Sequence, residues 1–249
     1  MTIEFDELGR AEMPAAPCLA VADLMGVWRR DLLVTPDGRR DDTSDVYWLQ
    51  SQTICGDMRR ETDPANAQTR LKAFAGRLSE RDGIFRWERT LASFPLDGPP
   101  DDGRLSWRGE ILREDGVHEP YWEIWARVAR PSPGDYAAEL HDPRAGRLGY
   151  ALSIGGFGFF AHRPALAGAD TAFALNGVDP AGNPLTLSIG RHPIDWRETG
   201  FPKMPGDTMR LPERDAEGNL ILTDWSVAVL ERPYLPPAGA TPKTGGKGR

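Results

Sequence analysis

The sequence of 249 residues is poor in the residues that build disulfide and metal sites. It has two cysteines, Cys18 and Cys55, without a Cys-x-x-Cys spacing, and four histidines, no two of which are spaced i, i+2 or i, i+4. Such cysteines do not indicate a disulfide framework or a zinc site, and we expect both to be reduced. The sequence therefore predicts no metal ion and no cofactor.

An excess of positive charge and a long apolar run are also absent. The formal net charge is −7 at pH 7, whereas binding to nucleic acid phosphates needs a concentrated basic surface. The longest apolar stretch, Gly149 to Ala161, is too short for a transmembrane helix and contains four glycines. The start, MTIEFDELGRAEM, has acidic residues where a secretory signal has a basic start and an apolar run. We therefore expect a cytoplasmic protein that binds neither nucleic acid nor membranes.

Familiar catalytic motifs are missing as well. No serine or cysteine lies in a Gly-x-Ser-x-Gly setting, which disfavours hydrolase chemistry. The run Gly155-Gly156-Phe157-Gly158 lacks the following helix that a dinucleotide-binding loop needs, so it predicts a kinked or bulged strand.

The sequence does have many short segments of alternating polarity, separated by Asp, Gly and Pro turns, which are typical of antiparallel strands. Between Asn66 and Arg81, in contrast, apolar residues fall at helical spacing after Asp63-Pro64, which predicts one helix. About a dozen strands with one helix predict a mainly β fold, an antiparallel barrel whose helix near residues 66–81 caps an opening. The expected strands are Val27 to Val34, Val46 to Gln52, Ile54 to Arg60, Ile84 to Leu91, Leu105 to Glu114, Tyr121 to Val128, Tyr136 to His141, Arg147 to Ile154, Gly158 to His162, Thr171 to Leu175, Leu185 to Ile189 and Leu220 to Leu230.

The domain organisation follows from composition. Residues 1–21 are a lead-in containing Pro and Ala, residues 22–232 are expected to form a single β-barrel domain, and the Pro-, Gly- and Lys-containing tail 233–249 is expected to be disordered. The segment 163–170, RPALAGAD, is either a long loop or a weak domain boundary. We favour a loop, because the remaining residues are too few to bury a core alone and would instead finish the sheet begun upstream.

Gly26-Val27-Trp28, placed after a short helical turn at the start of the first strand, resembles the Gly-x-Trp opening of the lipocalins, the calycin-type barrels. The last predicted strand ends at Arg232, where lipocalins often place an arginine that packs on that tryptophan. This resemblance implies a lipocalin-like barrel, although the larger number of strands and the early helix depart from the family. The segments WLQ, GDMRR and YWEIW are similar to an uncharacterised bacterial and fungal branch of such barrels, from which no activity carries over.

Charged and aromatic residues alternate along the same strands, and the direction in which they point decides their role. If these faces point inward, charged groups lie in a cavity and must pair or meet a ligand, because a lone buried charge is costly. If the faces point outward, the same residues form salt bridges across a solvated sheet. The residues concerned are Arg30, Gln50, Asp57, Arg59, Tyr121 and Glu123, beside Trp28, Trp48, Trp87 and Trp125.

The inward arrangement predicts binding of a small, partly apolar ligand with an anionic or carbonyl group. Trp side chains would enclose it, and Arg30 and Arg59 would fix its polar end. The alternative is a cofactor-independent lyase, isomerase or hydratase in which Asp57 or Glu123 is the catalytic acid or base. A third expectation is a homodimer or another protein partner at an outer apolar face.

Overall fold

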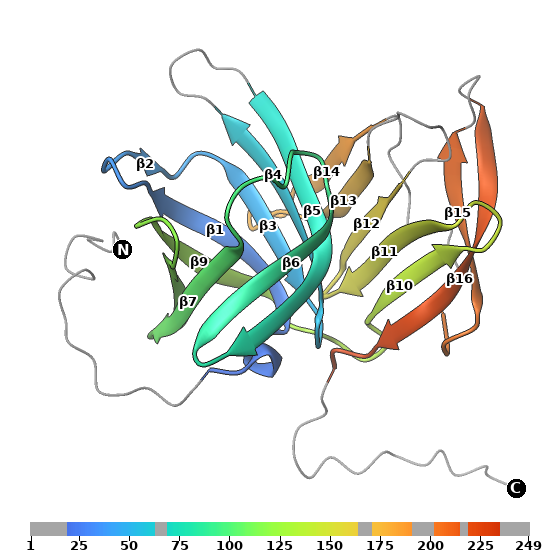
Figure 1. Cartoon of the computed structure of the whole chain (residues 1–249), viewed down its shortest axis with the longest axis horizontal. Coiled ribbons are helices and arrows are strands. Elements are labelled where there is room, and N and C mark those ends of the chain that lie inside the picture. Colours follow the sequence, from blue (N-terminus) through green and yellow to red (C-terminus); the bar gives the residue numbers. More distant parts are fainter. Residues whose placement is uncertain (1–18, 63–68, 164–170, 191–201, 215–218, 235–249) are drawn as a thin grey trace, which may run out of the picture.

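The computed structural model describes residues 19–62, 69–163, 171–190, 202–214 and 219–234. These residues form two antiparallel sheets that lie side by side (Figure 1). In the described part, the one helix is a short 3-10 turn, η2 (Val21–Leu24), which lies close to the helical turn expected before Gly26. No helix of the described residues is long and apolar enough to cross a membrane. The fold is therefore mainly β, as the alternation predicts.

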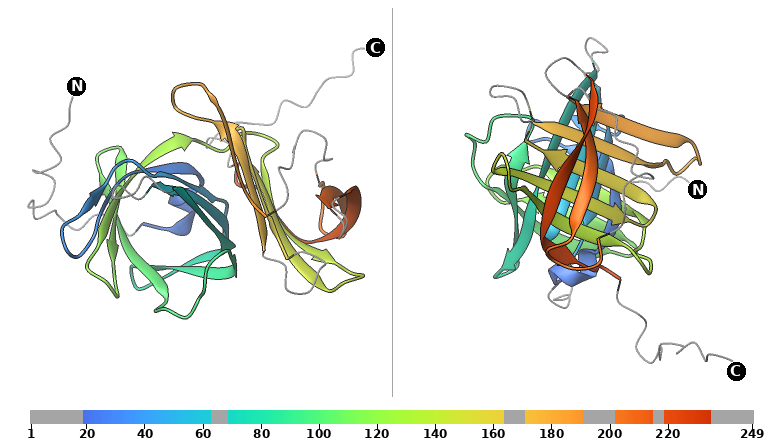
Figure 2. Two further views of the ribbon diagram at one scale, coloured as in Figure 1. Left: turned by 90° about the horizontal axis from the view of Figure 1, so that it is seen from above. Right: turned by 90° about the vertical axis from the view of Figure 1, so that its right-hand side faces the viewer.

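The first sheet closes into an eight-stranded barrel, because β1 pairs with β3 on one side and with β9 on the other. Figure 2 shows the barrel as a ring seen from above. The two-residue strand β2 pairs only with the end of β1. The strands of this sheet are β1 (Gly26–Val34), β2 (Arg40–Asp41), β3 (Asp45–Gln50), β4 (Ile54–Thr62), β5 (Thr69–Arg81), β6 (Ile84–Ala92), β7 (Asp101–Arg108), β8 (Ile111–Gly116) and β9 (Trp122–Ala129).

The later strands form a second, seven-stranded sheet in the order β14-β13-β12-β11-β10-β16-β15. We expected these strands to finish the sheet begun upstream, and this expectation is wrong. Because β9 closes the barrel on β1, the first sheet offers them no free edge, so they pair with one another. The strands are β10 (Tyr136–Asp142), β11 (Arg147–Ile154), β12 (Phe157–His162), β13 (Ala172–Val178), β14 (Pro184–Ile189), β15 (Thr208–Arg214) and β16 (Leu220–Glu231).

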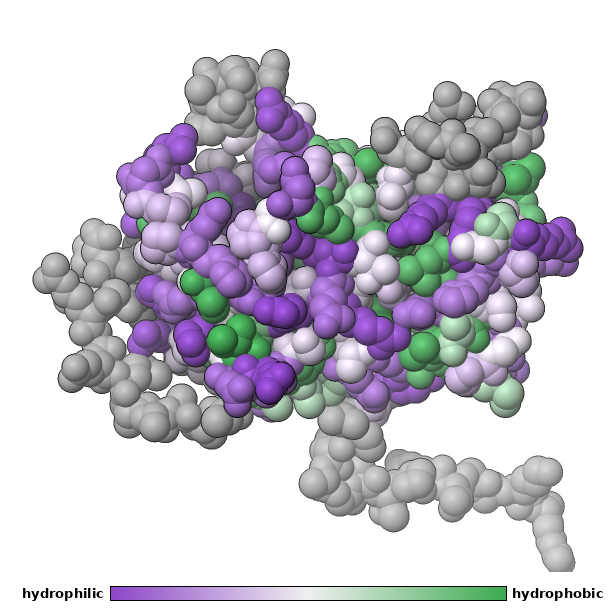
Figure 3. All heavy atoms as spheres, in the orientation of Figure 1, coloured by the Kyte–Doolittle hydropathy of each residue, from purple (hydrophilic) through white to green (hydrophobic). Residues whose placement is uncertain are grey.

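The two sheets share a core between the outer face of the barrel and one face of the second sheet. Tyr47, Leu49 and Met58 on the barrel pack in one cluster with Leu152 and Phe159 of the second sheet. The apolar outer face of β3, β4 and β5 is thus covered by the chain itself. The face drawn in Figure 3 is largely polar over the described residues, with apolar side chains in small areas.

The opposite face of the second sheet has its own core. Trp225 and Val227 of β16 and Met209 and Leu211 of β15 gather there with Phe160. Figure 2 shows the β15–β16 hairpin curling over this face. Of the tail predicted to be disordered, Pro233 is buried and Tyr234 is half-buried, and residues 235–249 lie outside the described residues.

The helix predicted over residues 66–81 is wrong. Residues 69–81 are strand β5, and residues 66–68 lie outside the described part. Both faces of β5 are buried: Phe74 and Leu78 lie in the barrel core, whereas Ala73 and Ala75 pack toward the second sheet. Because β5 is apolar on both faces, its apolar residues lose the simple period of two and fall at a spacing that imitates a helix.

The single strand predicted over residues 105–114 is also wrong. It is split into β7 and β8 by a two-residue turn, and Arg108 pairs with Ile111 across it. Gly109 in this turn has φ +65°, a conformation that glycine adopts without strain. The split matters for the site, because it places β8 as a separate wall strand beside β9.

Candidate functional site

One end of the barrel is closed by packing around Trp28. Its Nε1 donates a hydrogen bond of 2.7 Å to the carbonyl oxygen of Leu24 in η2, and its ring lies 5.9 Å from that of Trp48 in a stacked arrangement. The guanidinium of Arg127 lies over Trp28 at 4.4 Å from the ring. Burial and the neighbouring Arg130 lower the pKa of Arg127 to about 10, so it remains a cation at neutral pH.

The arginine that packs on Trp28 is therefore Arg127 of β9, and the expectation of Arg232 is wrong. Arg232 instead donates to the carbonyl oxygen of Pro202 at 2.7 Å. The reason is topological: the barrel ends at β9, so β16, which Arg232 directly follows, belongs to the second sheet. The last barrel strand, rather than the last strand of the chain, supplies the arginine.

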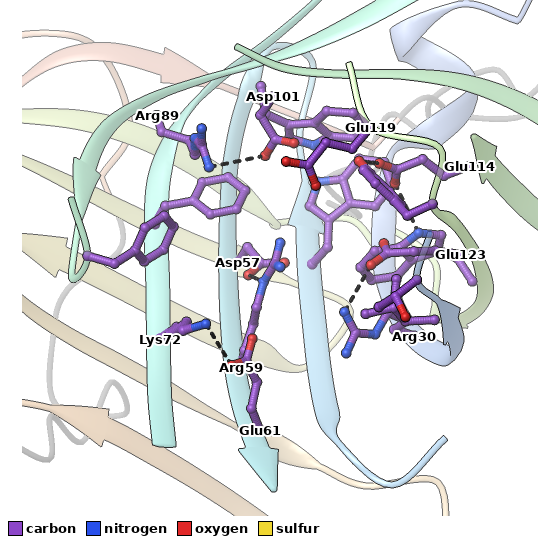
Figure 4. A pocket seen from close by; sticks show the side chains of 18 of the residues that line it. Arg30, Asp57, Arg59, Glu61, Lys72, Arg89, Asp101, Glu114, Glu119 and Glu123 are labelled. Carbon is purple, nitrogen blue, oxygen red and sulfur yellow. Dashed lines mark hydrogen bonds and ion pairs between the residues drawn. The ribbon is translucent and has the colours of Figure 1, made fainter. Parts of the chain in front are cut away.

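Beyond Trp48 the barrel encloses a cavity of about 460 Å³, within the range of small-molecule sites. Of the ten residues singled out by sequence, eight line it, and the inward arrangement of the charged faces is the one found (Figure 4). The eight are Arg30, Trp48, Asp57, Arg59, Trp87, Tyr121, Glu123 and Trp125. The other two, Trp28 and Gln50, are fully buried and do not line the cavity.

Gln50 instead supports Trp48, a residue that lines the cavity. Its Oε1 accepts a hydrogen bond of 3.0 Å from Trp48 Nε1, and its Nε2 donates to the carbonyl oxygen of Ser51. Trp48 in turn meets Trp87 and Trp125 edge-on, with ring centroids 5.5 and 5.8 Å away. These contacts hold three indole rings around the inner end of the cavity.

Arg30 is committed to two carboxylates rather than free for a ligand. Its Nη1 donates to Glu123 Oε1 at 2.9 Å, and its Nη2 donates to Asp41 Oδ2 at 2.9 Å. Its side chain is only 3% exposed. Burial raises the pKa of Glu123, against the opposing effects of Arg30 and Arg59. This ion pair therefore holds the wall strands β1 and β9 together from inside.

Arg59 differs, because only its Nε has a partner. That atom donates to Asp57 Oδ1 at 2.5 Å, while the terminal nitrogens form no hydrogen bond with any described residue. The guanidinium lies 5.7 Å from the centroid of the Phe74 ring, and the side chain is 24% exposed. Burial raises the pKa of Asp57 against the opposing effect of Arg59. Arg59 thus keeps donors for a ligand on the wall of the cavity.

Glu114 of β8 was missed by sequence reasoning. Its Oε1 accepts from the Tyr121 hydroxyl at 2.9 Å and its Oε2 from Trp125 Nε1 at 3.1 Å. Burial, together with Glu123 and Asp101 nearby, raises the pKa of Glu114 well above its usual range. Burial and Glu114 raise the pKa of Tyr121, so its hydroxyl stays protonated and donates.

The signal that could have found Glu114 is the alternation with Leu112, which is fully buried in the barrel core. Residues two apart share a face of a strand, so an inward Leu112 places Glu114 inward. Treating residues 105–114 as one strand hid this relation.

Leu33 was also missed by sequence reasoning. A register shift of β1 against β9 between Arg30 and Leu32 brings Leu33 to the cavity, whereas simple alternation places Leu32 on the face of Arg30.

The outer part of the cavity carries further charged groups that were not predicted (Figure 4). Lys72 Nζ lies 2.8 Å from Glu61 Oε2, and Arg89 Nη1 lies 3.8 Å from Asp101 Oδ2. Glu119 and Asp97 also line the cavity and form no ion pair with any described residue. Across the described part of the chain, no three His, Cys, Asp or Glu side chains gather as a metal-binding group.

A solved structure from yeast has a similar fold. The crystal structure of the uncharacterized protein YLR301w from Saccharomyces cerevisiae matches with a TM-score of 0.55 and 12% sequence identity, over 82% of this chain and 98% of that chain. This share exceeds the barrel alone, so the likeness extends to the second sheet. No protein family and no curated protein sequence matches the chain. At this identity the likeness shows the fold alone.

Proposed function

We propose that the barrel binds a small, partly apolar molecule bearing an anionic or carbonyl group. The single observation that carries the proposal is the cavity of about 460 Å³, which is lined both by indole rings and by Arg59, whose terminal nitrogens form no hydrogen bond with any described residue. Aromatic walls favour an apolar body, and a partly buried guanidinium with free donors favours a carboxylate or carbonyl. Arg30, already paired twice, supports the wall and is not assigned to the ligand.

The closed end of the barrel supports a lipocalin-like assignment. Trp28 on the first strand and Arg127 on the last barrel strand stack as the resemblance implies, and the closed eight-stranded architecture fits calycin-type barrels. Small barrels of eight strands enclose a space suited to one small ligand. On this basis we infer a carrier or sensor of a small molecule.

Ligand binding is tested with a broad panel of amphipathic metabolites. Because Trp48, Trp87 and Trp125 line the cavity, a bound molecule should change tryptophan fluorescence, and a ligand at a hundredfold excess over its Kd should raise stability by about 2.7 kcal/mol. A panel that leaves both fluorescence and the melting temperature unchanged would contradict the proposal.

A second candidate is a cofactor-independent lyase, isomerase or hydratase. The observation in its favour is that burial raises the pKa of Asp57, Glu114 and Glu123, all of which line one cavity. Asp57→Asn and Glu123→Gln separate the two functions once a ligand is found. An enzyme should lose about a hundredfold or more of its rate in one variant, whereas a binder should keep its affinity in at least one.

A further inference from the structure

The cavity has more acidic than basic groups. Seven carboxylates and four basic side chains line it. Each basic side chain already has a carboxylate partner: Arg30 with Glu123, Arg59 with Asp57, Lys72 with Glu61 and Arg89 with Asp101. Three carboxylates, those of Asp97, Glu114 and Glu119, form no ion pair with any described residue.

Glu114 differs from the other two because it is deeply buried. It is 4% exposed, whereas Asp97 and Glu119 are exposed. Its hydrogen bonds come from two neutral donors, the Tyr121 hydroxyl and Trp125 Nε1, one to each oxygen. An ionised carboxylate has about four lone-pair sites, so each oxygen of Glu114 keeps acceptor capacity beside the cavity. A buried carboxylate without a cation is costly unless a ligand supplies the cation.

The surroundings of Glu114 also favour a cation. Trp125 donates to Glu114 through its indole nitrogen, and Trp48 and Trp87 line the same cavity. The faces of indole rings attract ammonium groups, and this attraction strengthens away from water. An anionic group at this position would instead meet the carboxylates of Glu114, Glu123 and Asp101, whose mutual effect is already repulsive.

On the basis of the proposed binding function, we propose that the ligand carries a basic amine, bound as an ammonium ion by Glu114, in addition to the anionic or carbonyl group bound at Arg59. The expected ligand is therefore an amphipathic molecule with an aromatic or aliphatic body. It carries an amine together with either an anionic group or a carbonyl group. Asp101 and Glu119 add negative charge toward the outer part of the cavity and favour entry of such a cation.

Binding of this amine is coupled to the loss of the carboxyl proton of Glu114. Burial raises the pKa of Glu114, and at a pH below that raised pKa the unliganded carboxyl holds a proton. The ammonium group arrives already protonated, so its pairing with Glu114 requires the carboxyl proton to leave for solvent. No covalent bond forms or breaks except this O–H bond. Below the raised pKa of Glu114, amine binding therefore releases about one proton, and its affinity falls as the pH is lowered.

Two probes that differ only in the amino group test this inference by isothermal titration calorimetry. Indole-3-propionate offers an indole and a carboxylate, and tryptophan adds the amine. We expect tryptophan to bind the wild-type protein at least tenfold more tightly than indole-3-propionate. Glu114→Gln should remove this difference, whereas Glu88→Gln, the same change on an exposed residue of strand β6 of the barrel, should leave it intact.

The outcomes separate the two proposals. If indole-3-propionate binds as tightly as tryptophan, or Glu114→Gln leaves the difference unchanged, the amine inference is wrong and the binding function stands. If neither probe binds, the proposed function and the inference both fail. The comparison of the two probes on the wild-type protein needs no variant, so it tests the inference even if Glu114→Gln does not fold.

Discussion

Glu114 and Glu123 lie directly opposite each other on the neighbouring strands β8 and β9, yet only Glu123 has a guanidinium partner. Two carboxyl groups in such proximity cannot both ionise cheaply in a buried site. Arg30 compensates the charge of Glu123. Glu114 instead accepts hydrogen bonds from two neutral donors, the hydroxyl of Tyr121 and the indole nitrogen of Trp125. The asymmetry of this pair determines both the stability of the barrel and the chemistry that its cavity favours.

The first prediction concerns stability against pH. Because the pKa of Glu114 is raised in the folded state, its contribution favours folding below the unfolded pKa of about 4.3 and is lost as pH rises toward the folded pKa. Glu114→Gln should therefore match the wild type near pH 4 and gain on it by about 1.4 kcal/mol for each pH unit in that window. Urea unfolding at several pH values measures this difference.

The control for this prediction is Glu88→Gln, which changes an exposed carboxylate on β6. Its free energy of unfolding should follow the wild type at every pH to within about 0.5 kcal/mol. A Glu114→Gln curve parallel to the wild type would show that Glu114 is not an uncompensated buried carboxyl.

The second prediction concerns the buried ion pairs of Arg30. Arg30→Met leaves Glu123 without its guanidinium, and removing one partner of a buried pair costs about 3–5 kcal/mol. The neighbouring Arg29, whose side chain is 35% exposed and pairs with Asp31, is a matched control: Arg29→Met should cost about 1 kcal/mol or less. Equal losses in urea unfolding would contradict the distinction between the inward and outward arginines of β1.

The third prediction concerns the junction between the barrel and the second sheet. A Cβ at Gly56 would lie 2.6 Å from the ring of Phe159, so Gly56→Ala must displace a fully buried aromatic side chain. Overpacking of this kind costs about 1–3 kcal/mol. Gly98→Ala, where a Cβ meets nothing within 4 Å, is the control. If both variants melt at the wild-type temperature, the sheets do not pack as described.

The fourth prediction concerns the closed end of the barrel. Arg127 over Trp28 should contribute about 0.5–2 kcal/mol beyond the separate effects of the two side chains. A double-mutant cycle of Arg127→Met and Trp28→Leu, followed by urea unfolding, measures that coupling. Additive losses would mean that the stacked pair contributes nothing of its own.

Much of the barrel interior could be predicted from the sequence, because large aromatic and charged side chains recur at every second residue along β3, β4 and β9. Trp48, Asp57 and Glu123 were placed on shared faces by this alternation alone, and they line the cavity. The sequence could not decide whether those faces point inward, because the outer face of the barrel is also apolar where the second sheet covers it.

The errors have related physical causes. Strand β5 is buried on both faces, so its apolar residues lose the period of two, and Glu114 was hidden by a glycine turn that divides one expected strand into two. Closure of the sheet is a long-range property: the pairing of β1 with β9 joins residues about a hundred positions apart and leaves no local pattern. The misplaced arginine, Arg232 instead of Arg127, follows from the same cause.

The central claim is that the barrel cavity binds a small molecule through the free donors of Arg59. A fluorescence titration tests it most directly, with the wild type, Arg59→Met and Arg104→Met, the last an exposed arginine on the wall strand β7. For a ligand with a carboxylate or carbonyl group, we predict saturable quenching in the wild type and in Arg104→Met, and at least a tenfold weaker Kd in Arg59→Met. Equal affinity in all three proteins would contradict the claim.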